Sequence, residues 1–252
     1  RIAFCFPDTY EIGMSNLGMR ILYGVMNEMD GVWCERVFAP WADMQSAMEA
    51  NHIPLWALES QDSVADFDMI AFTIGYEMSY SNILNMLRLS GVPLHSRDRQ
   101  GLKNIVFAGG VCAFNPEPLA DFVDFFSLGE GEDSTVEIVS LYDQAKAEGW
   151  SKERFLLAVS KIPGVYVPSF YRHEYNDDGT LRVSDCFLEP KVEHYNYDYY
   201  AGAAYVYDIS RPVGQRVTAL TVAGKPVADD DVFTICLNSY RASGTGGYDC
   251  YV

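Results

Sequence analysis

The sequence predicts an α/β fold in which a doubly wound parallel sheet is followed by a β-rich segment, and three observations lead to this prediction. Over residues 1–165, short apolar runs alternate with amphipathic stretches, a pattern typical of a parallel sheet covered by helices. After Pro163 the helical spacing stops, and the turn sequence 176–179 separates two strand-like runs. Beyond residue 203 every candidate element is a strand.

The elements of the first segment follow from apolar periodicity. Strands are expected at about residues 2–6, 32–38, 68–74, 104–108 and 123–128. Helices are expected at about residues 15–29, 41–50, 79–89, 132–147 and 151–161, with Ser79 and Asp133 as early caps. Five strands joined by crossover helices predict a flavodoxin-like domain over residues 1–183. An appended β-hairpin would pair residues 165–171 with residues 180–183.

The second segment lacks helical periodicity. Strands are expected at residues 204–209, 216–222 and 232–238, separated by turn sequences rich in Pro, Gly and Asp. Residues 187–252 are therefore predicted to form a β-rich partial domain.

Composition excludes several classes of function. Among 252 residues, 18 Lys and Arg stand against 35 Asp and Glu, so no basic patch is expected to bind nucleic acid. The apolar runs have the length of strands, so no transmembrane segment or membrane partner is expected. Six cysteines lack the spacing of zinc or iron–sulfur ligands, and Cys5, Cys34 and Cys112 are interpreted as buried reduced thiols of a cytoplasmic protein. The chain opens directly on a strand without Met, as a chain entered partway would.

Glycine and polar residues gather after the first, third, fourth and fifth predicted strands. In an open doubly wound sheet, ligands bind beyond the carboxyl ends of the strands. Phosphate is disfavoured because there is no phosphate-binding loop motif and acidic residues occupy the predicted helix start at 130–133. First-turn helix stabilisation is the favoured role of those acids on general grounds. The predicted cofactor-binding residues are Tyr10, Gly13, Ser15, Asn16, Gly75, Gly109, Gly110, Asn115 and Glu130.

These loops carry a resemblance to a known family. The segments that carry it are FPDTYEIGMSNLG (6–18), DFDMIAFTI (66–74), NIVFAGGVCAFNPEPL (104–119) and DFFSLGEGE (124–132). They are similar to the cobalamin-binding-like domain that precedes the catalytic core in many radical S-adenosylmethionine (radical SAM) proteins, and the opening segment resembles an uncharacterised bacterial branch of them. The resemblance implies a domain packed on a partial barrel that holds a [4Fe–4S] cluster and S-adenosylmethionine.

Two motifs of that family are missing from this sequence. Without C-x-x-x-C-x-x-C the chain performs no radical chemistry alone, so the cluster and S-adenosylmethionine belong to a core that would be its partner. The D-x-H-x-x-G motif that supplies the cobalt ligand is absent as well, and His52 and His95 lie in polar loops where solvated side chains are expected. Cobalamin binding and a structural or substrate-gating role stay open as alternatives, and no metal site is expected.

The tail resembles a second family. The segments PKVEHYNYD (190–198), YDISRPVGQRV (207–217) and LNSYRASGTGG (237–247) are similar to the C-terminal substrate-binding domain of 5′-nucleotidases and cyclic phosphodiesterases, which are secreted or cell-surface hydrolases. The resemblance implies that Tyr240 stacks on a nucleobase, although a tyrosine packed on its own sheet is the alternative. Asn238, Arg241 and Gly244 complete the predicted nucleoside site. The metal-binding domain that such hydrolysis requires is absent.

Three hypotheses follow for function. The first is a non-catalytic accessory domain of a radical SAM enzyme, fused to a truncated nucleotide-binding fragment. The second is a fragment of a nucleotidase-type hydrolase that binds a nucleoside through Tyr240. The third is a docking domain without any ligand. Because neither half keeps its catalytic part, a chimeric reading frame joined near residues 183–188 is favoured over a natural fusion.

Overall fold

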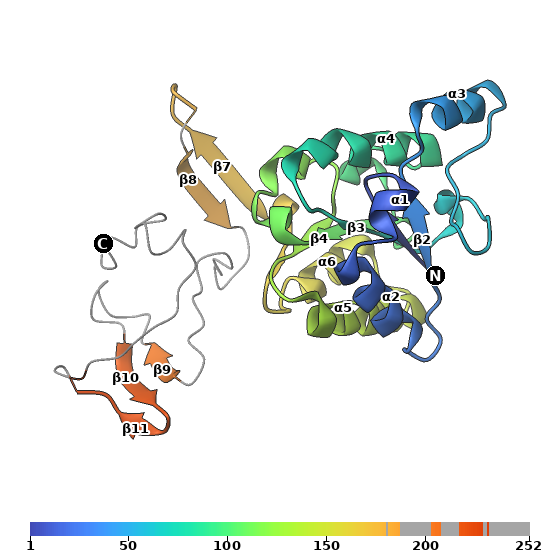
Figure 1. The fold of residues 1–252 in the computed structure, drawn as a ribbon. Coiled ribbons are helices and arrows are strands. Elements are labelled where there is room, and N and C mark those ends of the chain that lie inside the picture. The colour runs from blue at the N-terminus through green and yellow to red at the C-terminus, as the bar shows by residue number, and fades with distance from the viewer. Residues whose placement is uncertain (180, 187–202, 208–216, 229–230, 232–252) are drawn as a thin grey trace. The chain divides into compact units, whose positions relative to one another are not determined.

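The computed structural model describes residues 1–179, 181–186, 203–207, 217–228 and 231 (Figure 1). The chain divides into two compact units, Arg1–Asn196 and Tyr197–Val252. Among the described residues, no helix has the length and apolar character needed to cross a membrane.

The first unit is built on a six-stranded sheet with the order β2-β1-β3-β4-β5-β6. Its strands are β1 (Ile2–Phe6), β2 (Cys34–Phe38), β3 (Met69–Thr73), β4 (Ile105–Gly109), β5 (Phe125–Ser127) and β6 (Val165–Tyr166). The first five strands are parallel and β6 is antiparallel to β5. The parallel strands have the flavodoxin-like order 2-1-3-4-5, which confirms the predicted fold.

Helices cover both faces of this sheet. They are α1 (Tyr10–Gly13), α2 (Leu17–Asn27), α3 (Ala42–Ala50), α4 (Tyr80–Ser90), α5 (Gly131–Ala147) and α6 (Lys152–Val159). Helices α2, α5 and α6 lie on one face, and α3 and α4 lie on the other (Figure 1). Short 3₁₀ turns are η1 (Val64–Asp66), η2 (Glu77–Ser79), η3 (Ser96–Asp98), η4 (Val111–Phe114), η5 (Glu117–Leu119) and η6 (Pro168–Phe170).

Of the two predicted helix caps, Ser79 is confirmed as the N-cap residue of α4, and Asp133 is wrong. Ser79 precedes α4, but its hydroxyl donates to the Tyr76 carbonyl and makes no cap hydrogen bond. Asp133 lies inside the first turn of α5, whose N-cap is Glu130. Caps with side-chain hydrogen bonds occur instead at Asn16, which accepts from the amide of Met19, and at Ser151.

Alternate residues of each central strand enter the two cores. In β1, Ala3 and Cys5 pack in the cluster that contains α4, whereas Ile2 and Phe4 pack in the cluster that contains α2. Because both faces are covered, such strands are apolar throughout. The thiols of Cys5 and Cys34 are buried and free, as predicted, and burial raises the pKa of each. Cys112 is also free but only half-buried.

The appended hairpin exists, but its first arm differs from the prediction. Val165 and Tyr166 form β6 of the main sheet, and the hairpin pairs β7 (Tyr171–Tyr175) with β8 (Leu181–Cys186). Pro168 has no amide hydrogen and begins η6, which separates β6 from β7. The predicted turn is confirmed, since the amide of Gly179, at φ +83°, donates to the carbonyl of Asn176.

The second unit contains the antiparallel strands β9 (Ala203–Tyr207), β10 (Val217–Val222) and β11 (Lys225–Pro226), in the order β11-β10-β9. Ala223 and Gly224, both with positive φ, make the tight turn between β10 and β11. These strands confirm the β-rich character predicted here. The predicted strand at 232–238 lies outside the described residues.

Candidate functional site

The carboxyl ends of the parallel strands form one edge, and hydrogen bonds tie its loops together. The Tyr76 hydroxyl donates to Asp8 at 2.9 Å, and the Asn82 side chain donates to the carbonyl of Pro7 at 2.9 Å. These two bonds connect the loop after β1 with the segment after β3. The edge is thus preorganised by contacts between residues far apart in the sequence.

A second set of bonds ties the segments after β3 and β4. The Tyr80 hydroxyl donates to the carbonyl of Asn115 at 2.8 Å. The amide of Ile74 donates to Gly109 at 2.7 Å, and the amide of Cys112 donates back to Ile74 at 3.1 Å. The η4 turn is therefore fixed against the end of β3.

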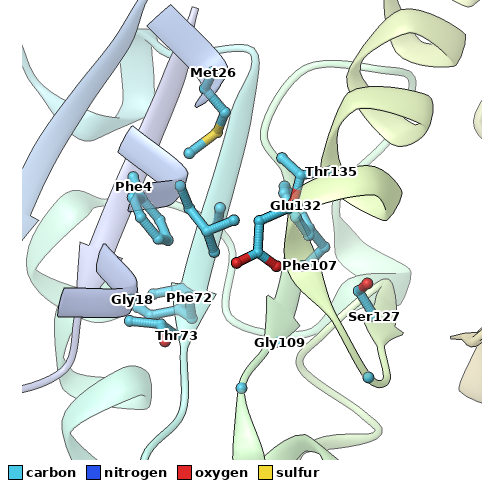
Figure 2. A pocket seen from close by; sticks show the side chains of 15 residues that line it. Phe4, Gly18, Met26, Phe72, Thr73, Phe107, Gly109, Ser127, Glu132 and Thr135 are labelled. Carbon is cyan, nitrogen blue, oxygen red and sulfur yellow. The ribbon is translucent and has the colours of Figure 1, made fainter. Parts of the chain in front are cut away.

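A cavity of about 190 Å³ opens at this edge, on the side of the sheet that α2 and α5 cover (Figure 2). Its apolar wall comes from β1, α2, β3 and β4, and its polar residues come mainly from the ends of β3 and β5 and the start of α5. The lining residues are Phe4, Gly18, Leu22, Met26, Ala71, Phe72, Thr73, Phe107, Gly109, Gly110, Ser127, Gly129, Gly131, Glu132 and Thr135.

Gly110 in this wall has no room for a side chain, and Gly131 has little. Gly110 has φ +99°, and a Cβ there would lie 2.8 Å from the carbonyl oxygen of Ile74. A Cβ at Gly131 would lie 3.2 Å from the Leu22 side chain. These positions bring β4 close to β3, and α5 close to α2, so glycine shapes the cavity as well as exposing backbone to it.

The polar side of the cavity is acidic and rich in hydroxyl groups. The hydroxyls of Ser127 and Ser134 lie 2.9 Å apart, and Ser134 Oγ is 3.0 Å from the Glu130 carbonyl oxygen. Figure 2 shows the Glu132 side chain reaching from α5 toward the side of the cavity where Phe4 lies. Within the described part of the chain, no hydrogen bond or ion pair engages its carboxylate. The cavity thus joins an apolar wall to the exposed carboxylate of Glu132, which has no side-chain partner among the described residues.

Two of the predicted cofactor-binding residues, Gly109 and Gly110, line this cavity. Of the others, Gly13 is buried in α1, where a Cβ would lie 2.3 Å from the Phe38 ring, and Tyr10 packs edge-on against that ring. Ser15 donates to the carbonyl of Ile12 at 2.8 Å. Together with the capping residue Asn16, these residues shape the loop between β1 and α2.

The remaining predicted residues also lie at the edge but not in the cavity lining. Gly75 follows β3, and a Cβ at this position would meet no heavy atom within 4 Å, so nothing in the fold demands glycine there. Asn115 ends η4, and Glu130 is the N-cap of α5. Binding roles for all of these residues stay predictions. Asn238, Tyr240, Arg241 and Gly244 lie outside the described residues.

Sequence reasoning missed most of the cavity lining. Leu22 and Met26 read as ordinary apolar residues of an amphipathic helix, and nothing in the sequence separates them from core residues. Gly129 and Gly131 flank a predicted residue, and Ser127 ends a predicted strand. The glycine pair around Glu130 was therefore the available signal for this part of the site.

The three histidines among the described residues of the first unit do not line the cavity. His52 is exposed after α3, as expected, but His95 is half-buried and stacks on Phe122 with ring centres 5.0 Å apart. His173 Nε2 lies 3.1 Å from the Tyr166 hydroxyl and 3.3 Å from the Glu117 carboxylate. Across the described ranges, no three His, Cys, Asp or Glu residues group as a metal site. These residues offer no imidazole to a cobalt ion at this edge.

Apolar side chains are also exposed in the loops at this edge of the sheet, on what we call the carboxyl-edge surface. Met78 is 82% exposed, Val111 73% and Phe114 64%, although all three side chains are apolar. They follow β3 and β4, while further exposed residues follow β1. The carboxyl-edge surface consists of Tyr10, Ile12, Leu17, Tyr76, Met78, Val111 and Phe114.

Two family matches divide the chain. Residues 18–168 match the family described as radical SAM proteins, N-terminal, and residues 170–252 match the 5′-nucleotidase C-terminal domain. The matches meet at the start of the β7–β8 hairpin, whereas the compact units divide after Asn196. The predicted bounds, 1–183 and 187–252, stay a prediction.

Individual proteins resemble the same two segments. The uncharacterized protein MJ0966 of Methanocaldococcus jannaschii is 26% identical over 168 residues, which cover 66% of this chain and 31% of that protein. The trifunctional nucleotide phosphoesterase YfkN of Bacillus subtilis is 30% identical over 73 residues, which cover 24% of this chain and 5% of that protein. The chain thus spans a third or less of the length of these relatives.

Two solved structures of the radical S-adenosylmethionine methyltransferase TsrM from Kitasatospora setae are also similar. One, with tryptophan and a SAM analogue, has a TM-score of 0.41 at 13% identity and covers 71% of this chain and 29% of TsrM. The other, with cobalamin and a [4Fe–4S] cluster, has a TM-score of 0.40 at 13% identity and covers 78% and 30%.

Proposed function

The chain belongs to the family of radical SAM proteins, N-terminal, and from this premise we propose that residues 1–183 are a non-catalytic accessory domain that docks on a radical SAM core. The observation that carries the proposal is the carboxyl-edge surface. An exposed group of large apolar side chains is typical of an interface. The proposed occupant is a radical SAM core in the same parent protein, since the matched segment of MJ0966 is 31% of that protein.

The geometry of this surface suits a lasting contact. Its loops are held by the Tyr76–Asp8 and Tyr80–Asn115 hydrogen bonds, so docking would order few additional residues. Two of its most exposed side chains, Met78 and Phe114, are large and apolar, and burying each would contribute about 1.5–3 kcal/mol before the cost of association.

Hydrogen–deuterium exchange in a hybrid protein tests this docking. Residues 1–183 would replace the matched segment of MJ0966, so that the domain and the remaining chain are covalently linked. We expect amides at 74–80 and 110–115 to exchange more slowly in the hybrid than in the present chain. Met78→Glu combined with Phe114→Glu should remove that protection, whereas Leu157→Glu, which alters an exposed residue of α6, should keep it. Equal exchange in hybrid and chain would refute docking through this surface.

We further propose that this domain holds no histidine-ligated cobalamin, and that the cluster and S-adenosylmethionine are held by the core. The absence of an imidazole among the described residues of the cavity supports this proposal. Titration of the full chain with hydroxocobalamin should leave the cobalamin absorbance spectrum unchanged. A shift that the cavity-blocking substitution Gly18→Leu abolishes would contradict it.

A second function is favoured for the tail by its match to the 5′-nucleotidase C-terminal domain. We propose that residues 187–252 bind a nucleoside through stacking on Tyr240, with Asn238, Arg241 and Gly244 nearby. Stacking on one aromatic ring contributes about 1–3 kcal/mol, so Tyr240→Ala should weaken adenosine binding roughly tenfold or more in calorimetry. Tyr240→Phe keeps the ring and should preserve binding. If the Tyr240→Ala variant bound adenosine as tightly as the unchanged chain, Tyr240 would not be part of the nucleoside site.

Whether the junction between the two segments is natural or chimeric can be tested separately. The two matched families support a chain that joins an accessory domain to a nucleotidase segment. We propose that the junction is chimeric, because neither segment carries the catalytic part of its family. A single DNA read across the codons for residues 150–220 should continue from the hairpin into a C-x-x-x-C-x-x-C segment. A read that carries the junction as written would establish a natural fusion.

A further inference from the structure

We infer that the cavity between α2 and α5 binds a small organic cation that carries one aromatic ring, with the ring on the apolar wall and the positive group at Glu132. This inference concerns a ligand of the domain and does not depend on docking to a core. Three observations carry it: the volume of the cavity, its apolar wall and the charge at its mouth.

The volume of the cavity limits the size of the ligand. A closed apolar cavity of about 150 Å³ is large enough to bind benzene. The present cavity, at about 190 Å³, therefore admits one six-membered ring and a few further atoms. It is too small to enclose a macrocycle.

The apolar lining of the cavity favours an apolar ring. Phe4, Leu22 and Phe107 line the cavity, so an apolar ring would meet carbon atoms of these side chains. Gly109 and Gly110 also line the cavity and contribute no side chain to it. Replacing water along this wall with a ring removes apolar surface from solvent.

The carboxylate of Glu132 favours a positively charged group on the ligand. The exposed Glu132 carboxylate has no ion-pair partner among the described residues, and the other polar side chains of the lining, those of Thr73, Ser127 and Thr135, carry no charge. The start of α5 would favour an anion, but Glu132 and Asp133 already place two negative charges there. A cationic group would compensate the Glu132 charge, whereas an anion would be repelled.

Three ligands of nearly equal shape test the inference on the full chain: benzamidine, which is a cation, neutral benzamide, and anionic benzoate. In calorimetry or NMR titration, benzamidine should bind about tenfold or more tightly than benzoate, with benzamide between them. Amide resonances of Gly109, Gly129 and Gly131 should shift on binding, since these glycines line the cavity.

Matched variants distinguish a direct contact between Glu132 and the ligand from a general effect of the protein's negative charge. Glu132→Gln should reduce the preference for benzamidine over benzoate to within about twofold. Asp133→Asn removes a neighbouring charge that is exposed like Glu132 but does not line the cavity, and it should leave most of the preference. Gly18→Leu places a larger side chain at the cavity wall and should weaken the binding of all three ligands.

Three results would overturn the inference. They are equal binding of benzamidine and benzoate, an unchanged preference in the Glu132→Gln variant, and the absence of glycine shifts at ligand concentrations that saturate any binding. Because these measurements need no core, they can fail while docking holds, and docking can fail while they succeed.

Discussion

Lys152 Nζ, at the start of α6, lies 2.7 Å from the carboxylate of Asp124, the residue directly before β5, and both side chains are buried. The same carboxylate lies 3.2 Å from Arg99 and accepts the amide of Val106 in β4 at 2.7 Å. One carboxylate therefore joins β4, β5, α6 and the loop before β4, at the end of the sheet opposite the candidate site.

Asp124→Asn should destabilise the protein strongly, because it leaves Lys152 and Arg99 as buried cations without a counterion. Breaking a buried ion pair in this way costs about 3–5 kcal/mol of the free energy of unfolding. Urea denaturation followed by circular dichroism measures the change. Asp121→Asn alters an exposed neighbour and should cost less than about 0.5 kcal/mol. Similar losses in both variants would show that the buried pair is not the cause.

Gly110→Ala should cost more than about 1 kcal/mol of the free energy of unfolding, because its φ of +99° strains a residue with a Cβ and that atom would lie 2.8 Å from the Ile74 carbonyl oxygen. Gly75→Ala is the matched control at the same edge, since a Cβ there meets no atom within 4 Å. Thermal unfolding of the two variants compares them directly. A Gly110→Ala protein as stable as the Gly75→Ala protein would contradict the described backbone.

Glu35 gives the fold a specific dependence on pH. Burial alone would raise the pKa of its carboxyl, but hydrogen bonds from Ser60, Arg1 and Trp33 outweigh this effect and lower the pKa. A carboxyl with a lower pKa in the folded state stabilises the protein above its unfolded pKa, about 4.3, and that stability is lost as pH falls further.

Glu35→Gln should therefore flatten the acid side of the stability curve. Denaturant unfolding at a series of pH values between about 3 and 6 covers the window in which the carboxyl titrates. Glu28→Gln removes an exposed carboxylate from the end of α2 and should leave the curve nearly unchanged. An equally steep acid limb in the Glu35→Gln protein would assign the pH dependence to other groups.

The sequence predicted the elements that have a strong period. Helices cover both faces of the sheet, so the buried positions of strands and helices are apolar. This periodic apolar pattern predicts the five parallel strands and five of the helices. Helix α1, with four residues, is too short to show a period. The boundary between β6 and β7 depends on Pro168 and on pairing with β5, a contact between distant residues that local spacing does not encode.

The candidate site was predicted only in part. The carboxyl-end rule places residues at the correct edge, but it does not tell which face of the sheet each loop reaches. Ile74 and Ala113 pack with the α4 cluster, and the predicted residues Gly75 and Asn115, which lie close to them in the chain, are not among the lining residues. Leu22 and Glu132 reach the cavity because α2 and α5 lie together on the opposite face, which is a property of helix packing.

Photo-crosslinking tests the central claim, docking through the carboxyl-edge surface, most directly. In the hybrid with MJ0966, p-benzoylphenylalanine would replace Met78, and a second protein would carry it in place of Leu157 as a control. After irradiation and proteolysis, mass spectrometry identifies the joined peptides. The account predicts links from position 78 to the core and few or none from position 157. No links from position 78, with efficient links from position 157, would contradict it.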